Sequence, residues 1–247
     1  MAEAPRLFVE DELALSDPVI FDPAQTNYLT RVMRLRTGDG VRLFNGRDGE
    51  WHAQLEVDGR RARAVLRSQT RAQYVPPQLS LIFAPLKKTR TDFLIEKATE
   101  LGATELAPIM TAFTQTQRVK EERLRALVIE AAEQTERLDV PDIAPVQSLS
   151  NLLAGWPEAR PLFYCDERGA ARTMADELVA VGPGPAGVLV GPEGGFSETE
   201  RQQLRALPFV RPVTLGPRIL RAETAAVAAL SLWQSGVGDW HDIPYLP

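Results

Sequence analysis

Two glycine-rich turns near the C-terminus carry the residues best suited to bind a small molecule. The first is Gly191-Pro-Glu-Gly-Gly-Phe196, and the second is Leu215-Gly-Pro-Arg-Ile-Leu-Arg221. Gly194 and Gly195 allow positive φ and let the backbone come close to a bound molecule. One such turn alone is also found in an ordinary strand-to-helix connection. Two turns close together in the chain favour a ligand site.

Short apolar runs should place both turns at one edge of a sheet. Val188-Leu-Val190 leads directly into the first turn, and such a run bounded by glycines predicts a buried strand. Ser197-Glu-Thr-Glu200 is a capping box that predicts the start of a helix. A further buried strand, from Pro161 to Asp166, should bring Cys165 to the same edge. Ligands bind at the carboxyl ends of the strands in open α/β sheets.

The sequence does not support a dinucleotide or ATP site. Gly182-Pro-Gly-Pro-Ala-Gly187 matches the dinucleotide fingerprint, but it precedes a strand, and Pro183 and Pro185 have no amide hydrogen. The first turn lacks the Lys-Ser/Thr pair of a phosphate-binding loop.

Several motifs together resemble the ribosomal RNA small-subunit methyltransferase E (RsmE) family of the SPOUT superfamily. The two longest are GPEGGFSETE at 191–200 and LGPRILRAETAA at 215–226. Shorter matches lie at Arg31–Arg34, Glu96–Gly102 and Glu130–Gln134. The resemblance covers most of the chain, and its motifs occur in the order found in the family.

The resemblance implies methylation of N3 of one uridine in 16S ribosomal RNA, with S-adenosylmethionine as the methyl donor. It also implies a homodimer and an α/β domain with a deep trefoil knot that forms the cofactor pocket. The expected cofactor-binding residues are Cys165, Val190, Gly191, Pro192, Glu193, Gly194, Gly195, Leu215, Gly216, Ile219, Leu220 and Thr224. A bulky residue at Gly194 or Gly216 should therefore abolish cofactor binding.

Composition limits the classes of protein that fit. The 247 residues are 44% hydrophobic, and no apolar run approaches the roughly 20 residues of a membrane span. The first residues lack the basic and apolar segments of a signal peptide. Cys165 is the single cysteine and there are two histidines, so we expect neither a disulfide nor a zinc cluster. A cytoplasmic protein without a metal is expected.

Charge is distributed unevenly along the chain. The net charge is −5, but residues 31–75 hold ten arginines against five acidic residues, a local net charge of +5. A basic region on an acidic protein is suited to a locally docked phosphate backbone, although scattered solvated arginines remain an alternative. Arg6, Arg31 and Arg34 are the RNA-binding candidates in this half.

The first 75 residues predict short strands and one helix. The helix runs from Asn27 to Arg36, with Leu29, Val32 and Met33 on its apolar face and the arginines opposite. The strands are Arg6–Val9, Val41–Phe44, Trp51–Val57 and Arg61–Leu66, and Asp58-Gly59 predicts a tight hairpin. Closely spaced antiparallel strands suggest a small barrel. The resemblance implies a PUA-like RNA-binding barrel, with Tyr28 where relatives often have His.

The paired prolines of Tyr74-Val-Pro-Pro-Gln78 predict an extended linker between two domains, at 1–75 and 76–247. Strands then alternate with helices, beginning with a strand at Leu79–Ala84 and a helix from Thr91 to Leu101 that Gly102 ends. Lys87 and Arg90 lie at the end of that strand. They are candidates for phosphate contacts, although lysine at such a position is more often simply solvated.

A helix from about Lys120 to Leu138 carries a polar stripe at helical spacing. Its members are Glu130, Glu133, Gln134 and Arg137, opposite an apolar stripe. An ordinary Glu133–Arg137 pair would explain part of it. The resemblance implies that this face lines the substrate pocket, with Gln134 and Arg137 on the RNA. The loop Thr111–Thr114 lacks the Glu-Arg pair that some relatives have there.

The final predicted helix, Ala222–Gln234, is apolar almost all round and rich in alanine. Small side chains on a helix covered on all sides require close approach by another backbone. A knotted turn or a subunit interface would each supply that contact.

The chemistry of uridine N3 sets what the site must do. The base must be extruded, and N3 must lose its proton before it attacks the methyl group. Arg221 is expected to stabilise the anionic base, and Glu133 or water to accept the proton. Arg221 paired with Glu193 or Glu223 would instead hold the two turns together. The competing class is a non-catalytic nucleotide- and RNA-binding protein.

Overall fold

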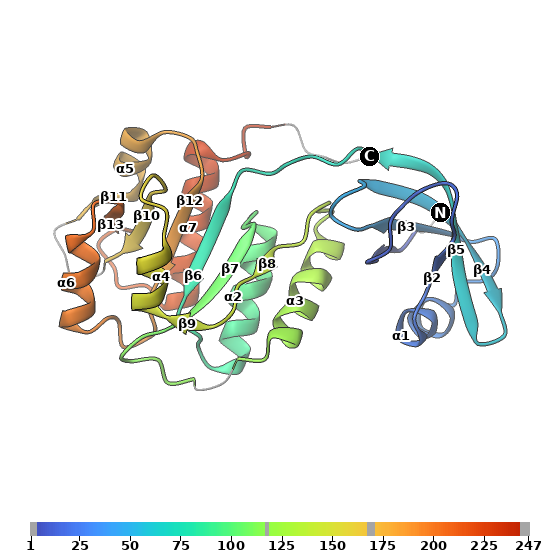
Figure 1. Cartoon of the computed structure of the whole chain (residues 1–247), viewed down its shortest axis with the longest axis horizontal. Helices are drawn as coiled ribbons and strands as arrows, with labels where there is room; N and C mark the ends of the chain where they lie inside the picture. The colour runs from blue at the N-terminus through green and yellow to red at the C-terminus, as the bar shows by residue number, and fades with distance from the viewer. Residues whose placement is uncertain (1–3, 117–118, 167–170, 243–247) are drawn as a thin grey trace. The chain divides into compact units, whose positions relative to one another are not determined.

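The computed structural model describes residues 4–116, 119–166 and 171–242. The chain forms two compact units (Figure 1). The first holds the described part of Met1–Val75 together with Ala132–Val140, and the second holds Pro76–Ala131 and the described part of Pro141–Pro244. Nothing in the sequence analysis placed Ala132–Val140 with the first unit. None of the helices in the described ranges combines the length and apolar character needed to cross a lipid bilayer.

The first unit is built on a five-stranded half-barrel. In spatial order its strands are β1 (Arg6–Phe8), β3 (Gly40–Phe44), β4 (Glu50–Asp58), β5 (Arg61–Arg71) and β2 (Val19–Ile20). β1 pairs with β3 in parallel, and the other neighbours are antiparallel. The predicted hairpin is confirmed, since Asp58 lies opposite Arg61 and Gly59 has a φ of 59°. Alternate residues of β5 (Ala62, Ala64 and Leu66) enter the core.

The helix of the first unit begins earlier than predicted. Asp22 and Gln25 form a capping box that starts α1 (Pro23–Asn27), which continues into the π-helical turn η1 (Tyr28–Val32). Leu29 is buried as expected, but Val32 and Met33 are exposed, so the predicted apolar face was too wide. The helical path ends before Arg34, which has a left-handed φ of 58°.

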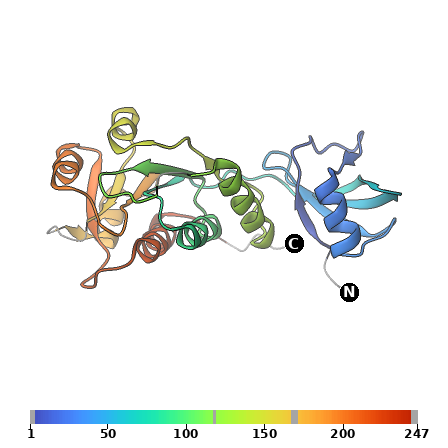
Figure 2. The same cartoon turned by 90° about the horizontal axis from the view of Figure 1, so that it is seen from below.

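The second unit is a parallel sheet covered by helices on both faces. The strand order is β11 (Arg172–Thr173), β13 (Val210–Thr214), β10 (Leu162–Cys165), β12 (Ala186–Val190), β6 (Leu79–Phe83), β7 (Glu105–Met110) and β8 (Asp142–Ile143), with β9 (Gln147–Ser148) also beside β7. Figure 2 shows α4 (Leu149–Gly155) and α6 (Glu198–Ala206) on one face, and α2 (Lys88–Glu100) and α7 (Ala222–Val237) on the other. The helix α5 (Met174–Val181) packs against α7.

The sheet brings the two glycine-rich turns to one edge. The pairs β10–β12, β10–β13 and β12–β6 are all parallel, so the carboxyl ends of these four strands lie at the same edge. The predicted strand before the first turn is confirmed, because β12 is buried along its whole length. Residue Leu189 packs with Ile82 and Leu162 beneath α4 and α6. This apolar packing holds the strand ends, and therefore the turns, in fixed register.

The helix α3 (Glu121–Gln134) is shorter than predicted. It ends at Gln134, and Glu136 has a left-handed φ of 61° that turns the chain away from the helical path. Arg137 therefore does not continue the polar stripe of Glu130 and Glu133, and this part of the sequence prediction was wrong. A glutamate at positive φ gives no sequence signal of the kind that glycine gives.

The last helix, α7, buries one stripe and leaves the other partly open. Ala222, Ala225, Ala226, Ala229 and Leu230 lie on the buried stripe, with Trp233 1% exposed. Its small side chains pack against α2, α5 and β12. At the flank of this stripe, Leu232 is 37% exposed. The chain alone thus covers only part of this apolar helix.

Candidate active site

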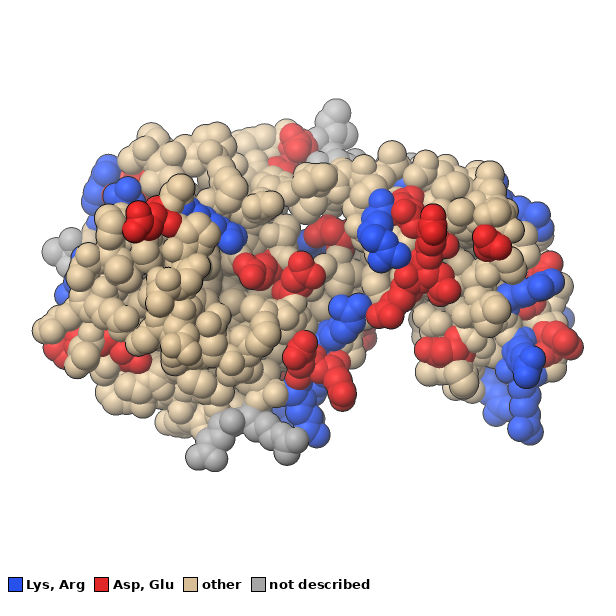
Figure 3. Space-filling model, viewed as in Figure 1, with Lys and Arg blue, Asp and Glu red and all other residues tan. Residues whose placement is uncertain are grey.

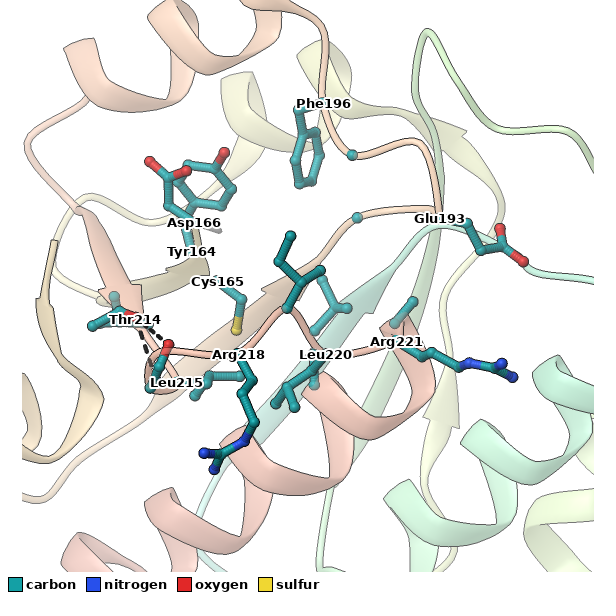
Figure 4. Close-up of a pocket in the computed structure, with 18 of the residues that line it drawn as sticks. Tyr164, Cys165, Asp166, Glu193, Phe196, Thr214, Leu215, Arg218, Leu220 and Arg221 are labelled. Atoms are coloured by element: carbon teal, nitrogen blue, oxygen red, sulfur yellow. Dashed lines mark hydrogen bonds between the residues drawn. The ribbon is translucent and has the colours of Figure 1, made fainter. Parts of the chain in front are cut away.

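The two glycine-rich turns meet around a cavity of about 300 Å³ (Figure 4). That volume suits a small-molecule ligand. The residues predicted to bind a cofactor that do line it are Cys165, Val190, Gly191, Pro192, Glu193, Gly195, Leu215, Gly216, Ile219 and Leu220. Arg221 lines it too, whereas Gly194 and Thr224 are exposed and are not part of the lining. The pairing of the two turns at one site follows from their shared sheet edge.

Close packing beneath the first turn explains the need for glycine at position 191. A Cβ on Gly191 would lie 2.6 Å from the ring of Phe196. That ring is 4% exposed and meets Tyr164 edge-to-face, with 5.3 Å between the ring centroids. The predicted capping box follows, since Ser197 N donates to Glu200 Oε2 at 2.8 Å and Ser197 Oγ accepts from Glu200 N. The turn is thus fixed at both ends.

The role expected for Gly194 differs from its position in the structure. Gly195 has a φ of 69°, but Gly194 is not among the residues with positive φ. A Cβ on Gly194 would lie 3.1 Å from the Cβ of Phe113, in the loop after β7. The missing side chain at position 194 therefore makes room for Phe113, and contact of Gly194 with a cofactor stays a prediction.

The floor of the cavity carries neutral groups next to a paired carboxylate. Burial raises the pKa of the Cys165 thiol to about 12, so the thiol is protonated at neutral pH and is a poor nucleophile. Burial and the neighbouring Asp166 carboxylate raise the pKa of the Tyr164 hydroxyl. Asp166 is 3% exposed and is paired with Arg205 on α6. The thiol and the phenol therefore offer neutral polar contacts, and the Asp166 carboxylate is held by its ion pair with Arg205.

Sequence reasoning missed part of the lining. Tyr164 and Asp166 flank Cys165 at the end of β10, and that strand end was the available signal. Phe196 and Arg218 belong to the two turns themselves. Arg201 lies one helical turn into α6, where it pairs with Glu198 at 2.9 Å, and nothing in the sequence indicated it. The remaining lining residues not predicted are Val213, Thr214, Pro217, Ala222 and Ala225.

Arg221 stands at the junction of the second turn and α7. It is the N-cap residue of the helix, with φ −67° and ψ 154°. Figure 4 shows its side chain on the same side of the cavity as Glu193. The carboxylates of Glu193 and Glu223 pair instead with Arg90, at 3.1 Å and 3.7 Å. The arrangement in which Arg221 holds the two turns through these carboxylates is therefore absent from the described residues.

Arg90 was predicted to contact RNA, and the structure places it between protein carboxylates. It joins α2 to the first glycine-rich turn through Glu193 and to α7 through Glu223. Lys87, the N-cap residue of α2, is exposed four residues after the end of β6, and its contact with RNA stays a prediction.

Arg6 and Arg137 are buried within the first unit. Arg6 is 7% exposed, and its Nε donates to Glu50 Oε2 at 2.6 Å. Its other nitrogens donate to the carbonyl oxygens of Ala132 and Arg137. Arg137 is also 7% exposed and pairs with Asp139. Both guanidinium groups are enclosed, away from the surface on which the sequence analysis placed them.

Glu50 is the centre of this buried ion cluster, which we define as Arg6, Arg42, Arg71, Glu50 and Glu136. Arg71 Nη2 donates to Glu50 Oε2 at 2.6 Å, and Arg42 Nη2 lies 2.7 Å from Glu136 Oε1. Burial of the Glu50 carboxyl raises its pKa, but hydrogen bonds from Arg71, Arg6 and Thr70 outweigh burial and lower the pKa to about 2. Two of the ten arginines counted as a basic region are therefore neutralised internally.

The other predicted residues of the first unit have separate positions. Glu133 Oε1 accepts from Phe8 N at 2.9 Å, and Gln134 is exposed at the end of α3. Neither lines the cavity. Arg31 and Arg34 are exposed. Figure 3 shows acidic and basic side chains interspersed on the visible face of this unit, so its surface is not uniformly basic.

Both halves of the chain match models of protein families. Residues 74–234 match an RNA methyltransferase domain, and residues 21–66 match an RNA methyltransferase PUA domain. The chain is 33% identical to the ribosomal RNA small subunit methyltransferase E of Rickettsia conorii, over 92% of this chain and 93% of that protein. This chain belongs to the ribosomal RNA small-subunit methyltransferase E family. The PUA-like half-barrel contains the residues that match the PUA model, and the α/β domain contains most of those that match the methyltransferase model.

Solved structures agree with membership of the methyltransferase E family. The crystal structure of the family member from Neisseria gonorrhoeae, bound to S-adenosylmethionine, has a TM-score of 0.86 and 30% identity, over 96% of this chain and 100% of that one. A putative methyltransferase from Legionella pneumophila, also with bound S-adenosylmethionine, has a TM-score of 0.85 and 27% identity, with the same coverage. Both structures align with this chain along nearly its whole length, through both units.

Proposed function

We propose that this protein transfers a methyl group from S-adenosylmethionine to N3 of a uridine in 16S ribosomal RNA. The observation that carries the proposal is the cavity between the two glycine-rich turns, in a chain that belongs to a ribosomal RNA methyltransferase family. A relative that covers 96% of this chain binds S-adenosylmethionine. The uridine and its N3 atom follow from the family alone.

The cavity residues fit S-adenosylmethionine chemically. Backbone groups of the two turns would supply hydrogen-bond partners for the adenine edge, and the apolar lining residues Val190, Leu215 and Leu220 would suit its faces. Among the charged residues of the lining, Asp166 would suit the hydroxyl or ammonium groups and Arg201 the carboxylate. When bound, the cofactor supplies an electrophilic methyl group on a sulfonium. The described residues hold no cluster of carboxylates, histidines or cysteines that could hold a metal ion.

The protein groups must stabilise a uracil that has lost its N3 proton. The base must leave its stack to reach the cavity, and its negative charge then spreads onto the carbonyl oxygens. Arg221 presents a planar set of donors and stays charged, so we assign it to those oxygens. Glu133 as proton acceptor stays a prediction. Its carboxylate accepts a hydrogen bond from Phe8 N, and Glu133 is not part of the cavity lining. Water is the alternative acceptor.

Methylation by the purified chain tests the proposal. We expect 3-methyluridine in 16S ribosomal RNA after incubation with S-adenosylmethionine, detected by mass spectrometry of the digested RNA. Gly216→Val should weaken cofactor binding at least about tenfold, because Gly216 lines the cavity and has a φ of 109°.

Gly182→Val is the matched control, since Gly182 has a φ of 76°, equally open space around it, and no place in the cavity lining. Equal losses in the two variants would mean that backbone strain, rather than the cavity, controls binding. Preference for ATP or GTP over S-adenosylmethionine in titration calorimetry would point to a non-catalytic nucleotide- and RNA-binding protein.

We propose that residues 1–75, completed by 132–140, dock the RNA, and that 76–247 hold the catalytic site. Replacing Arg31 and Arg34 by alanine should weaken RNA binding and flatten the dependence of log K on log salt concentration by about 2, since each phosphate contact contributes about 0.9. Both side chains are exposed and lie on or beside η1.

Replacing Arg60 and Arg61, exposed at the β4–β5 hairpin, changes the net charge equally and serves as the control. Filter binding of 16S ribosomal RNA across a salt series measures both double variants. Equal losses would show that only overall charge matters, and no loss would remove η1 from the RNA-binding surface.

We further propose that the protein is a cytoplasmic homodimer and that the second glycine-rich turn is part of a trefoil knot. The partly open apolar face of α7, including Leu232, supports an additional protein contact there. Sedimentation that finds an active monomer at assay concentration would contradict the dimer.

A further inference from the structure

The loop after β7 holds an exposed aromatic side chain in a fixed position. Phe113 is 48% exposed. On either side of it, Thr111 N donates to Thr114 Oγ1 at 2.9 Å, and Ala112 N donates to Glu200 Oε1 at 2.8 Å. Thr116 Oγ1 donates to Leu86 O at 2.7 Å. The loop is therefore tied to the capping box of α6 and to the chain after β6.

The ring is held against the first glycine-rich turn. A Cβ on Gly194 would lie 3.1 Å from Phe113 Cβ and 3.6 Å from its Cγ, so the glycine permits direct contact. Gly194 stands between Glu193 and Gly195, which both line the cavity. Phe113 thus lies beside the cavity without being part of its wall.

The Phe113 loop is tied to a segment that carries two exposed lysines. β7 is the neighbour of β6 in the sheet, and Lys87 and Lys88, just after β6, are both exposed. Thr116 ties the Phe113 loop to Leu86, the residue before these lysines. A half-exposed aromatic ring on a loop joined to a segment with two exposed lysines can engage a base on the ring and phosphates at the lysines.

We propose that Phe113 is a stacking surface for an unpaired base of the RNA substrate, beside the cofactor cavity. This inference rests on the proposed function and deepens it. A base taken out of its helix loses its stacking partners, and an aromatic side chain replaces them. The hydrogen bonds fix the loop that carries the ring before RNA binds, so less entropy is lost on binding.

Substitutions that separate aromatic stacking from apolar bulk test the proposal. Steady-state methylation of 16S ribosomal RNA at saturating S-adenosylmethionine should show that Phe113→Ala and Phe113→Leu raise the KM for RNA at least about fivefold. Phe113→Tyr should stay within about twofold of the original chain, because the tyrosine ring also stacks. Phe93→Ala removes a phenylalanine of similar exposure (42%) from the middle of α2 and should leave the KM for RNA unchanged. Cofactor affinity should be equal in all of them.

Three results would overturn the proposal. A leucine variant with the original KM would show that Phe113 supplies only apolar bulk. Weaker S-adenosylmethionine binding by Phe113→Ala would make the ring a support for the first turn. Sedimentation that finds Phe113→Ala monomeric where the original chain is dimeric would assign the ring to a second copy of the chain.

Binding of single-stranded decauridine separates this inference from the proposed function. If the original chain leaves 16S ribosomal RNA unmethylated but binds decauridine in a way that depends on Phe113, the proposed function fails and the stacking surface stands. Decauridine binding that is absent, or that is unchanged in Phe113→Ala, contradicts the stacking surface.

Discussion

Glu50→Gln is expected to destabilise the first unit by about 3–5 kcal/mol, because it leaves buried guanidinium groups without their counter-charge. The Glu50 side chain is fully buried, and Arg6 and Arg71 each approach it to 2.6 Å. Urea titration followed by hydrogen–deuterium exchange of peptides from β4 and β5 measures the free energy of unfolding locally.

Glu56→Gln on the same strand is the matched control. Glu56 pairs with Arg63 at 2.6 Å, but both side chains are exposed, at 40% and 55%. A solvated pair contributes only about 0–1 kcal/mol, so the control should lose little. Similar losses in the two variants would mean that burial adds nothing to the strength of the Glu50 contacts.

Acid should weaken the same unit through the Glu50 carboxyl. Its pKa falls from an ordinary value of 4.5 to about 2 in the folded protein. A group with a depressed pKa adds stability above its unfolded pKa and loses it as the pH falls through the folded value. Stability should therefore decline between about pH 4.5 and pH 2, and the decline should be smaller in Glu50→Gln. An identical acid profile in the variant would contradict this assignment.

The local motifs could be predicted because a few neighbouring residues determine them. The capping box at Ser197 and Glu200, the Asp58-Gly59 hairpin and the strand Val188–Val190 each depend on short-range hydrogen bonds or burial. Two parallel strands that end in glycine-rich turns then bring those turns together at the sheet edge. The placement of both turns at one site followed from this rule, whereas the individual cofactor-binding residues came from the family resemblance.

Residues whose partners are distant in sequence could not be predicted in this way. Arg6 was predicted to bind RNA, yet Glu50 and the carbonyl of Ala132 enclose it. Arg137 was assigned to a helical face that ends at Gln134. Gly194 had the right residue type for a ligand turn, but its neighbour is Phe113. The neighbours of these residues are far from them in sequence or depend on where a helix ends, and a local pattern does not indicate either.

Arg221→Ala should lower the methylation rate about a hundredfold, and Arg221→Lys about tenfold, with S-adenosylmethionine affinity nearly unchanged. Loss of one donor to a developing oxyanion typically costs 10²–10³ in rate. Lysine keeps the charge but lacks the planar fork, and a tenfold loss corresponds to about 1.4 kcal/mol of transition-state stabilisation. Single-turnover rates with saturating RNA and cofactor measure the chemical step directly.

The carboxylates near Arg221 make this prediction specific. Glu193 and Glu223 pair with Arg90. In the described part of the chain, Arg221 therefore does not form the ion pairs that a structural role would require. Arg211→Ala on β13 removes an exposed arginine outside the cavity lining and should leave the rate unchanged. If cofactor affinity falls in parallel with the rate in Arg221→Lys, the side chain shapes the cavity. If the rate falls alone, the guanidinium acts on the uracil oxygens.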